Sequence, residues 1–201
     1  EALMGHTGML DRPLFVSSGK VYTDDAFVKT SVSEKKIDLE LEIQNPTDQP
    51  MEVSVVQEVT PWKGGDVEKR FADQTITVPA FGMKKLAASA PWENPKLWWP
   101  DEPNLYILTT TLKSGDEVID IKKTRFGFRE WDWSTTRFKL NGVVWKLWQT
   151  GHSRHDTPEE MLADMRATNQ DVYRWRIGLG QSREKFAGLN LREFLHFADE
   201  N

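Results

Sequence analysis

The chain is 201 residues long, carries a formal net charge of −5 and contains no cysteine. The lack of cysteine excludes disulfide scaffolds, cysteine-based zinc sites and thiol nucleophiles, and an acidic balance without long blocks of like charge argues against nucleic acid or a membrane surface as the main partner. No apolar stretch approaches the roughly 20 residues needed to span a bilayer, and Glu1 does not begin a signal peptide, so we expect a piece of a longer chain.

Apolar and polar residues alternate over much of residues 15–129. The alternation is clearest in KIDLELEIQN (36–45), where four aliphatic side chains alternate with acidic or amide ones, which indicates a strand with one buried face. Turn-forming residues follow it, and further strand candidates lie at 13–18, 25–32, 51–59, 74–80, 105–112 and 118–128. About seven short strands in little more than a hundred residues predict an all-β immunoglobulin-like sandwich.

Two adjacent tryptophans, Trp98 and Trp99, lie among three prolines in NPKLWWPDEPNLY (94–106). Three interpretations compete: a platform on which a sugar stacks, a buried corner of the sandwich, and a wedge between two domains. Large aromatic rings are more often buried in cores and interfaces than exposed as ligand platforms. We therefore expect both rings to be largely buried, in the sandwich or at its junction with the segment that follows.

The pattern changes after Arg129. The segment RFKLNGVVWKLW (137–148) predicts a hairpin, because Asn141–Gly142 suits the positive φ angles of a tight turn between two extended arms. The strand that leaves this hairpin should end at QTGHSRHD (149–156).

A helix is predicted next, at TPEEMLADMRAT (157–168). It begins with a capping box: Thr157 can accept a hydrogen bond from a free amide, Pro158 suits the first helical position, and Glu160 can reach back. One side of this helix can face a sheet, because apolar residues lie on adjoining turns.

A strand and a second helix complete the pattern. QDVYRWRI (170–177) is a compact strand candidate, and LREFLHFADEN (191–201) returns to helix. The apolar face of that helix consists of Leu191, Phe194, Leu195 and Ala198. Strand, helix, strand and helix in this order predict the beginning of a parallel α/β architecture, which further chain or a partner must complete.

The order of these motifs resembles that of glycoside hydrolase family 2, which includes β-galactosidases, β-glucuronidases and β-mannosidases. The motifs that carry the resemblance are NPKLWWPDEPNLY, RFGFRE (125–130), FKLNG (138–142), GHSRH (151–155), the arginine of QDVYR, and FLHFADEN. The resemblance implies an immunoglobulin-like sandwich over residues 1–130 and a truncated N-terminal portion of a (β/α)8 barrel, its first two βα units, over residues 131–201.

The same resemblance implies what the parent protein does. It would be a β-galactosidase-like enzyme that hydrolyses terminal β-glycosidic bonds with retention and needs no organic cofactor. Its partners would be a carbohydrate substrate and the remaining domains of the parent chain, and its location would be secreted or periplasmic. The alternative is a noncatalytic β-sandwich module of a multidomain protein that binds glycan or protein.

Catalytic carboxylates are not expected in this chain. Retaining glycosidases use two carboxyl groups about 5–5.5 Å apart, and the resemblance implies that both are glutamates on later barrel strands, one of them preceded by asparagine. The chain contains no Asn-Glu pair. Its adjacent acids, Glu159–Glu160 and Asp199–Glu200, lie in predicted helices, where neighbouring side chains point in different directions. We therefore expect the chain alone to be inactive.

Two substrate-binding residues are implied at the ends of the first two barrel strands, where barrel sites form. His155 corresponds to a histidine that contacts the sugar, with a hydrogen-bonded loop histidine as the alternative. Arg174 corresponds to an arginine that supports the nucleophile, since a fixed cation keeps a carboxylate ionised and oriented; a structural ion pair is the alternative. The chain departs from the family at Thr150, Ser153 and Asp171.

Two weaker motifs predict no site. His152, His155 and Asp156 share one loop but lack a further histidine or cysteine ligand, so no metal site is predicted. GLGQS (178–182) lacks the third glycine of a dinucleotide-binding fingerprint.

Overall fold

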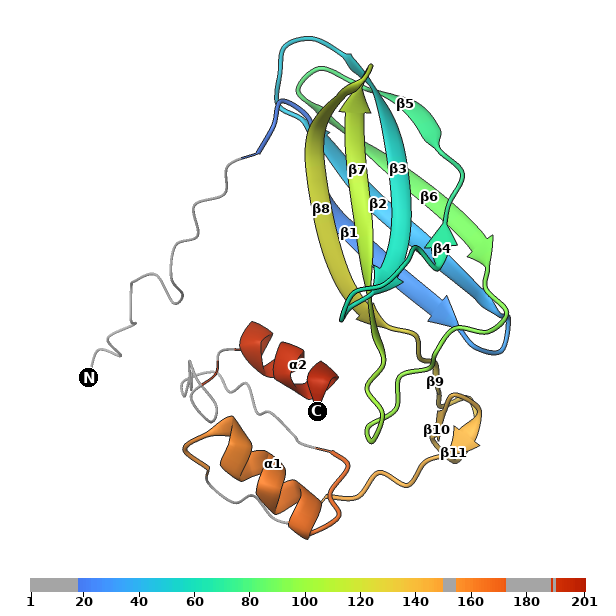
Figure 1. The fold of residues 1–201 in the computed structure, drawn as a ribbon, viewed down its shortest axis with the longest axis vertical. Coiled ribbons are helices and arrows are strands. Elements are labelled where there is room, and N and C mark those ends of the chain that lie inside the picture. Colours follow the sequence, from blue (N-terminus) through green and yellow to red (C-terminus); the bar gives the residue numbers. More distant parts are fainter. Residues whose placement is uncertain (1–17, 150–154, 173–188, 190) are drawn as a thin grey trace, which may run out of the picture. The chain divides into compact units, whose positions relative to one another are not determined.

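A computed structural model describes residues 18–149, 155–172, 189 and 191–201 (Figure 1). The chain divides into two compact units. One comprises residues 18–146 together with 199–201, and the other comprises residues 1–17 and 147–198, of which the structure describes a part. Each unit is described by itself below.

The larger unit is a sandwich of two antiparallel sheets (Figure 1). The first sheet has the order β1-β2-β6 and consists of β1 (Tyr22–Ser31), β2 (Lys36–Asn45) and β6 (Gly82–Pro91). The second has the order β4-β3-β7-β8, with β5 also paired to β3. Its strands are β3 (Met51–Pro61), β4 (Lys69–Arg70), β5 (Gln74–Val78), β7 (Leu105–Ser114) and β8 (Glu117–Gly127).

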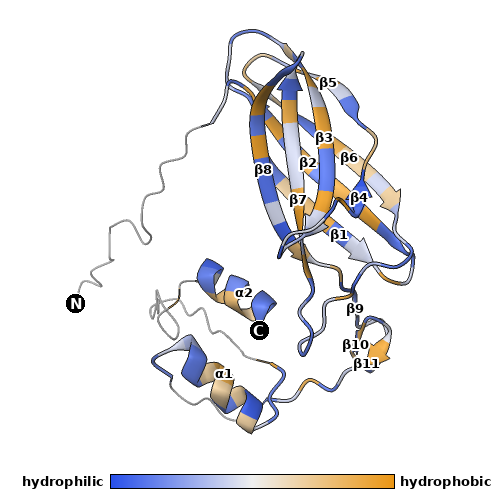
Figure 2. Ribbon diagram, viewed as in Figure 1, coloured by the Kyte–Doolittle hydropathy of each residue, from blue (hydrophilic) through white to orange (hydrophobic). Residues whose placement is uncertain are grey.

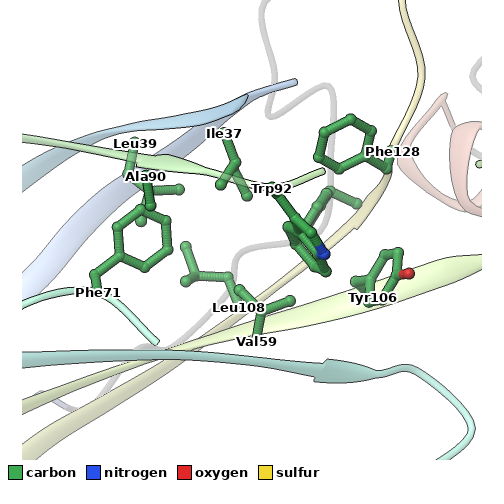
Figure 3. Close-up of a cluster of buried hydrophobic side chains, with 10 residues drawn as sticks. Ile37, Leu39, Val59, Phe71, Ala90, Trp92, Tyr106, Leu108 and Phe128 are labelled. Carbon is green, nitrogen blue, oxygen red and sulfur yellow. The ribbon is translucent and has the colours of Figure 1, made fainter. Parts of the chain in front are cut away.

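The alternating sequence explains how the sheets pack, and Figure 2 shows the alternation along the strands. In β2 the side chains of Ile37, Leu39, Leu41 and Ile43 are buried, because every second residue of a strand points to the same face. They join two apolar clusters that fill the space between the sheets. Figure 3 shows one of them, in which Trp92 lies edge-on to Tyr106 and Phe128.

A buried polar pair separates the two clusters. Gln57 on β3 lies opposite Thr110 on β7, and both side chains point into the core. Gln57 Nε2 and Thr110 Oγ1 have no hydrogen-bond partner among the described residues. An unpaired polar atom in a core lowers stability, because its hydrogen bond to water is lost on folding.

The predicted β-sandwich is confirmed, with two strands that the sequence did not indicate, the short β4 and the longer β6. The segments predicted from residue 25 to residue 128 form β1, β2, β3, β5, β7 and β8, while residues 13–17 of the first candidate lie outside the described part. The longer of the two, β6, pairs along its whole length with β2. Its sequence GMKKLAASAP lacks β-branched residues and has two adjacent lysines, so local preference does not indicate a strand.

A small third sheet follows the sandwich within the same unit. It consists of β9 (Trp131–Asp132), β10 (Lys139–Leu140) and β11 (Val143–Val144), in the order β11-β10-β9. The predicted tight turn is confirmed, with φ angles of 51° at Asn141 and 82° at Gly142. The expectation of a longer strand leading to GHSRH was wrong for residues 145–149, which are not in a strand. The Trp145 N–H donates to the carbonyl of Phe138, and the ladder between β10 and β11 ends at Val144.

The smaller unit contains helix α1 (Pro158–Ala167), whose predicted cap is confirmed. The Thr157 side chain accepts a hydrogen bond from the Glu160 N–H at 3.2 Å, and Pro158 lies in the first turn. The Glu160 carboxylate accepts from the Asp156 N–H at 3.2 Å, one residue before the position that a capping box uses.

The apolar face predicted for the second helix is only partly buried. Helix α2 (Leu191–Glu200) buries Phe194, whereas Leu195 is 56% exposed and Ala198 is also exposed; the side chain of Leu191 lies outside the described part. An apolar stripe is buried only where another element covers it, and the described residues leave Leu195 uncovered.

The parallel strands predicted after Arg129 do not appear among the described residues. Every strand pair that they form is antiparallel. Of the strand candidate 170–177, residues 170–172 are described and are not in a strand, and the rest lies outside the described part. The beginning of a (β/α)8 barrel therefore stays a prediction. No helix within the described ranges is long and apolar enough to cross a membrane.

Candidate functional site

Of the two predicted substrate-binding residues, the structure describes one. His155 lies two residues before the cap of α1, and its side chain is only 10% exposed. Its Nε2 atom lies 3.1 Å from Oδ2 of Asp164, on the same helix. Arg174 lies outside the described residues, so the structure does not bring the two predicted residues together.

The ring of His155 has one nitrogen that is unpaired. Nδ1 is buried and has no hydrogen-bond partner within the described part of the chain. The sequence indicated His155 but not Asp164, because an aspartate inside a helix has many ordinary roles and no motif distinguishes this one. Across the described ranges no group of three or more His, Cys, Asp or Glu side chains could hold a metal ion.

The adjacent acids of the predicted helices make structural contacts. Glu160 caps α1 through its main chain and its carboxylate, while Asp199 pairs with Arg129 and Glu200 with Arg125. These roles agree with the expectation that the acids are capping or surface groups. Glu160, Asp199 and Glu200 are thus each held by a cation or a main-chain amide that a reacting sugar would have to displace, and Glu159 is exposed.

The best-formed polar arrangement of the larger unit lies where the sandwich meets the third sheet, and Trp98 is at its centre. Trp98 is 8% exposed and packs with Leu105 and Leu140 in a separate apolar cluster. The main-chain N–H of Trp98 donates to the Phe128 carbonyl at 3.0 Å. The Arg129 guanidinium lies over the indole ring, with 4.3 Å from Cζ to the ring centroid. A cation over a partly desolvated indole stabilises this packing.

Burial of the double tryptophan is confirmed for Trp98 and holds in part for Trp99. Trp99 is half-buried at the edge of the same cluster, with its ring centroid 6.0 Å from that of Trp145. Trp98 does not form a stacking platform, because Arg129 covers its ring. Of the three interpretations, packing of the sandwich against the next segment agrees with these contacts.

Asn141 connects three segments that are distant in sequence. Its Nδ2 donates to the Trp98 carbonyl at 3.0 Å, and its Oδ1 accepts from the Glu130 N–H at 2.9 Å. Its own N–H donates to the Glu130 carbonyl at 2.8 Å. The side chain of the turn residue therefore fixes the turn to both the Trp98 loop and the end of the sandwich.

Glu130 continues the connection to the hairpin between β1 and β2. Its carboxylate accepts from Ser31 Oγ at 2.9 Å, from the Ser33 N–H at 2.9 Å and from Ser33 Oγ at 2.8 Å. Burial alone would raise the pKa of Glu130, but hydrogen bonds from Ser33, Ser31 and Val32 outweigh it and hold the pKa below its ordinary value. The carboxylate is thus ionised and fully engaged at neutral pH. We call Trp98, Arg129, Glu130 and Asn141 the junction cluster.

The junction cluster also includes a contact with the last residues of the chain, which belong to the same compact unit. Trp98 Nε1 donates to the Asp199 carbonyl at 2.8 Å. Arg129 pairs with the Asp199 carboxylate at 2.9 Å. The indole N–H, which needs a partner when it is buried, is satisfied by protein.

A shallow hollow of about 330 Å³ lies on the outer face of β1, β2 and β6. Its charged lining includes Lys29, Asp38 and Glu40. Lys29 pairs with Glu40 at 2.5 Å, and the hydrogen bond from Ser89 contributes most to lowering the pKa of Asp38. Asp38 also pairs with Lys36 at 3.3 Å, so each charge of the hollow already has a partner.

Comparison with known proteins identifies the family of this sandwich. The sequence model of glycosyl hydrolases family 2 matches residues 21–129, which begin one residue before β1 and end two residues after β8. A candidate β-glucuronidase of Formosa agariphila is 47% identical over 76 residues, which are 35% of this chain and 7% of that protein. A β-galactosidase of Enterobacter cloacae is 25% identical over 118 residues, 56% of this chain and 12% of that protein.

Solved structures show the same fold. The crystal structure of a Bacteroides uniformis β-glucuronidase superposes with a TM-score of 0.61 at 20% identity, covering 79% of this chain and 22% of that one. The fold and a family match that spans the whole sandwich define a β-sandwich module of the glycosyl hydrolases. The chain belongs to glycosyl hydrolase family 2, and it spans only 7–12% of the length of the first curated relatives it matches.

Proposed function

We propose that the chain is part of a retaining glycoside hydrolase that cleaves terminal β-glycosidic bonds, in which it supplies the scaffold sandwich and the first part of the catalytic barrel. The family match over residues 21–129 carries this proposal. Residues 131–146 follow the sandwich directly and are fixed to it by the junction cluster. The sandwich then has the role of orienting the segment with which the barrel begins.

The surface of the third sheet supports the presence of further protein beside it. The sheet and the segment between β9 and β10 expose several large apolar side chains: Trp131, Trp133, Phe138, Val143 and Val144. Such a concentration of exposed apolar residues marks an interaction surface. In the proposed parent the remaining barrel covers it.

The chain alone lacks the chemistry for hydrolysis. A retaining glycosidase needs a nucleophile and an acid/base about 5–5.5 Å apart, whereas Glu160, Asp199 and Glu200 are bound to the cap of α1, to Arg129 and to Arg125. We propose that both catalytic glutamates come from other parts of the parent. His155 would contact the sugar, and Arg174 would hold the nucleophile ionised.

The proposed substrate is a terminal β-glucuronide or β-galactoside. The support for these sugars comes from relatives named as β-glucuronidases and β-galactosidases. A glucuronide carries a carboxylate where a galactoside carries a neutral CH2OH, and the two sugars also differ in the configuration of C4. A pocket that prefers the glucuronide should therefore present a cation to its carboxylate.

The test is turnover of chromogenic β-glucuronides, β-galactosides and β-mannosides by this chain and by a version extended through the parent barrel. We expect hydrolysis by the extended protein alone, and the best substrate identifies the sugar. Activity of the short chain would contradict the assignment of its acids. Inactivity of both, combined with glycan binding, would favour the noncatalytic module, for which the hollow on β1, β2 and β6 is the first surface to mutate.

A further inference from the structure

The His155–Asp164 pair is buried more deeply than a surface ion pair. The His155 side chain is 10% exposed and the Asp164 side chain 33%. The contact spans nine residues of sequence and fixes the loop before α1 to the helix itself. Asp164 has a fixed backbone, because its carbonyl accepts hydrogen bonds from both the N–H and the hydroxyl of Thr168.

The chemistry of the pair determines where the imidazole proton lies. An ionised carboxylate can only accept hydrogen bonds, so Nε2 of His155 must carry the proton that it shares with Asp164. In the neutral ring the other nitrogen is then a bare acceptor. That nitrogen, Nδ1, is buried and lacks a partner in the described part of the chain.

A buried acceptor without a partner is unfavourable, so the arrangement is complete only when a donor reaches Nδ1. The groups that a sugar offers in greatest number are hydroxyl donors. A carboxylate bound to one ring nitrogen is a general means of fixing the tautomer and the orientation of an imidazole, so that the other nitrogen faces its partner.

We propose that Asp164 is a positioning residue: it holds Nε2 of His155 and so presents Nδ1 as the acceptor for a substrate hydroxyl. The proposal rests on the proposed function, in which His155 contacts the sugar. It adds the residue that sets the tautomer of His155 and the ring atom that would meet the ligand.

The first test uses the 201-residue chain and does not depend on catalysis. Long-range 1H–15N NMR at pH 8, above the ordinary pKa range of histidine, shows which ring nitrogen carries the proton, and a His155→Gln variant identifies the signals. We expect a protonated Nε2 and a bare Nδ1. In Asp164→Ala, which preserves helix propensity, the Nε2 proton should exchange with water at least about tenfold faster.

Two variants make the result specific. Asp164→Asn keeps an acceptor oxygen and should restore slow exchange, whereas Glu159→Ala removes an acid from the first turn of the same helix and should leave His155 unchanged. Circular dichroism and amide spectra establish that α1 remains folded in each. A proton on Nδ1 of the wild-type ring, or unchanged exchange in folded Asp164→Ala, would overturn the proposal.

The second test uses the extended protein and separates the two proposals. If it hydrolyses a β-glycoside, Asp164→Ala should lower kcat/KM and Asp164→Asn should restore most of it. Hydrolysis that is insensitive to both variants would overturn the positioning role while the proposed function stands. A fixed ring in an extended protein that hydrolyses no glycoside would instead overturn the proposed function and, with it, the sugar as the donor to Nδ1.

Discussion

Asn141 donates a hydrogen bond through Nδ2 to the carbonyl of Trp98, 43 residues earlier in the chain and 3.0 Å away. Because Asn141 also accepts from the Glu130 N–H, one side chain joins the Trp98 loop, the end of the sandwich and the turn of the third sheet. A turn residue of this kind has two separable roles, one in the backbone and one in the side chain.

Asn141→Gly separates those roles. Glycine suits the φ of 51° at least as well as asparagine, so the variant removes only the two side-chain hydrogen bonds. Leaving the Trp98 carbonyl and the Glu130 N–H unpaired should lower the free energy of unfolding by about 2 kcal/mol, measured by urea denaturation. Asn169→Gly is the matched control, because Asn169 also has a φ of 51° but no side-chain hydrogen bond to the described residues. Equal effects of both substitutions would contradict the connecting role.

Glu130 should make the larger unit sensitive to acid. Its folded pKa lies below the ordinary value, so its ionised form stabilises the fold above the unfolded pKa near 4.5, and this contribution is lost as the pH falls through the lower folded value. Glu130→Gln should therefore be less stable than the wild type at pH 7, with the difference shrinking below pH of about 4.5. Urea unfolding between pH 3 and 7 measures this. The exposed control Glu52→Gln should show no such trend, and a pH-independent difference for Glu130→Gln would refute the assignment.

Trp98 should contribute far more to stability than an exposed tryptophan. Trp98→Leu removes the ring that packs against Leu105 and Leu140 and under Arg129, and should cost roughly 2–4 kcal/mol. Trp133 is 70% exposed, so Trp133→Leu should change stability by less than about 0.5 kcal/mol. Thermal unfolding followed by circular dichroism compares the two, and similar losses would show that Trp98 is not the structural centre of the junction cluster.

Gly127 is expected to be intolerant of a side chain because of Trp98. A Cβ added at Gly127 would lie 2.9 Å from the Cβ of Trp98, which is too close for two carbons, so Gly127→Ala should cost about 1–3 kcal/mol. Trp98→Gly removes the Cβ, Cγ and Cδ1 atoms that the added carbon would meet, so it should relieve part of that cost. The double variant tests this, since additive losses would mean that the two positions do not interact.

The buried polar pair predicts a gain of stability. Gln57→Met keeps the shape of the side chain and removes the unpaired Nε2, so the free energy of unfolding should rise by about 1 kcal/mol. Gln49→Met, on the loop before β3, is the control for a gain in hydrophobicity alone. A loss of stability in Gln57→Met would indicate that the amide has a partner, such as an internal water molecule.

The sequence predicts those strands whose alternation is strong. In β2 every second residue is aliphatic, so its bounds agree with the structure at both ends. The strand β6 was not predicted because its burial depends on β2, beside which it lies, and not on its own composition. Local patterns carry no information about such a neighbour.

The candidate site was predictable only in part, for a related reason. His155 was indicated by resemblance, and Asn141 by the geometry of its turn. Their partners Asp164, Trp98 and Glu130 are distant side chains or main-chain atoms whose contacts exist only in the folded chain. A lone aspartate or glutamate in a sequence has no feature that shows which group it will bind.

The turn at Asn141 also bears on the chemical ageing of the protein. An asparagine followed by glycine is prone to deamidation, because the unhindered glycine nitrogen can attack the side-chain amide carbon. The attack expels ammonia and forms a cyclic imide, which water then opens to an acid. The product acid lacks the Nδ2 donor that reaches the Trp98 carbonyl, and it places a negative charge beside that oxygen. The two hydrogen bonds of the Asn141 side chain must break before its amide can react in this way. Partial unfolding during storage would therefore convert a reversible opening of the junction cluster into a permanent one.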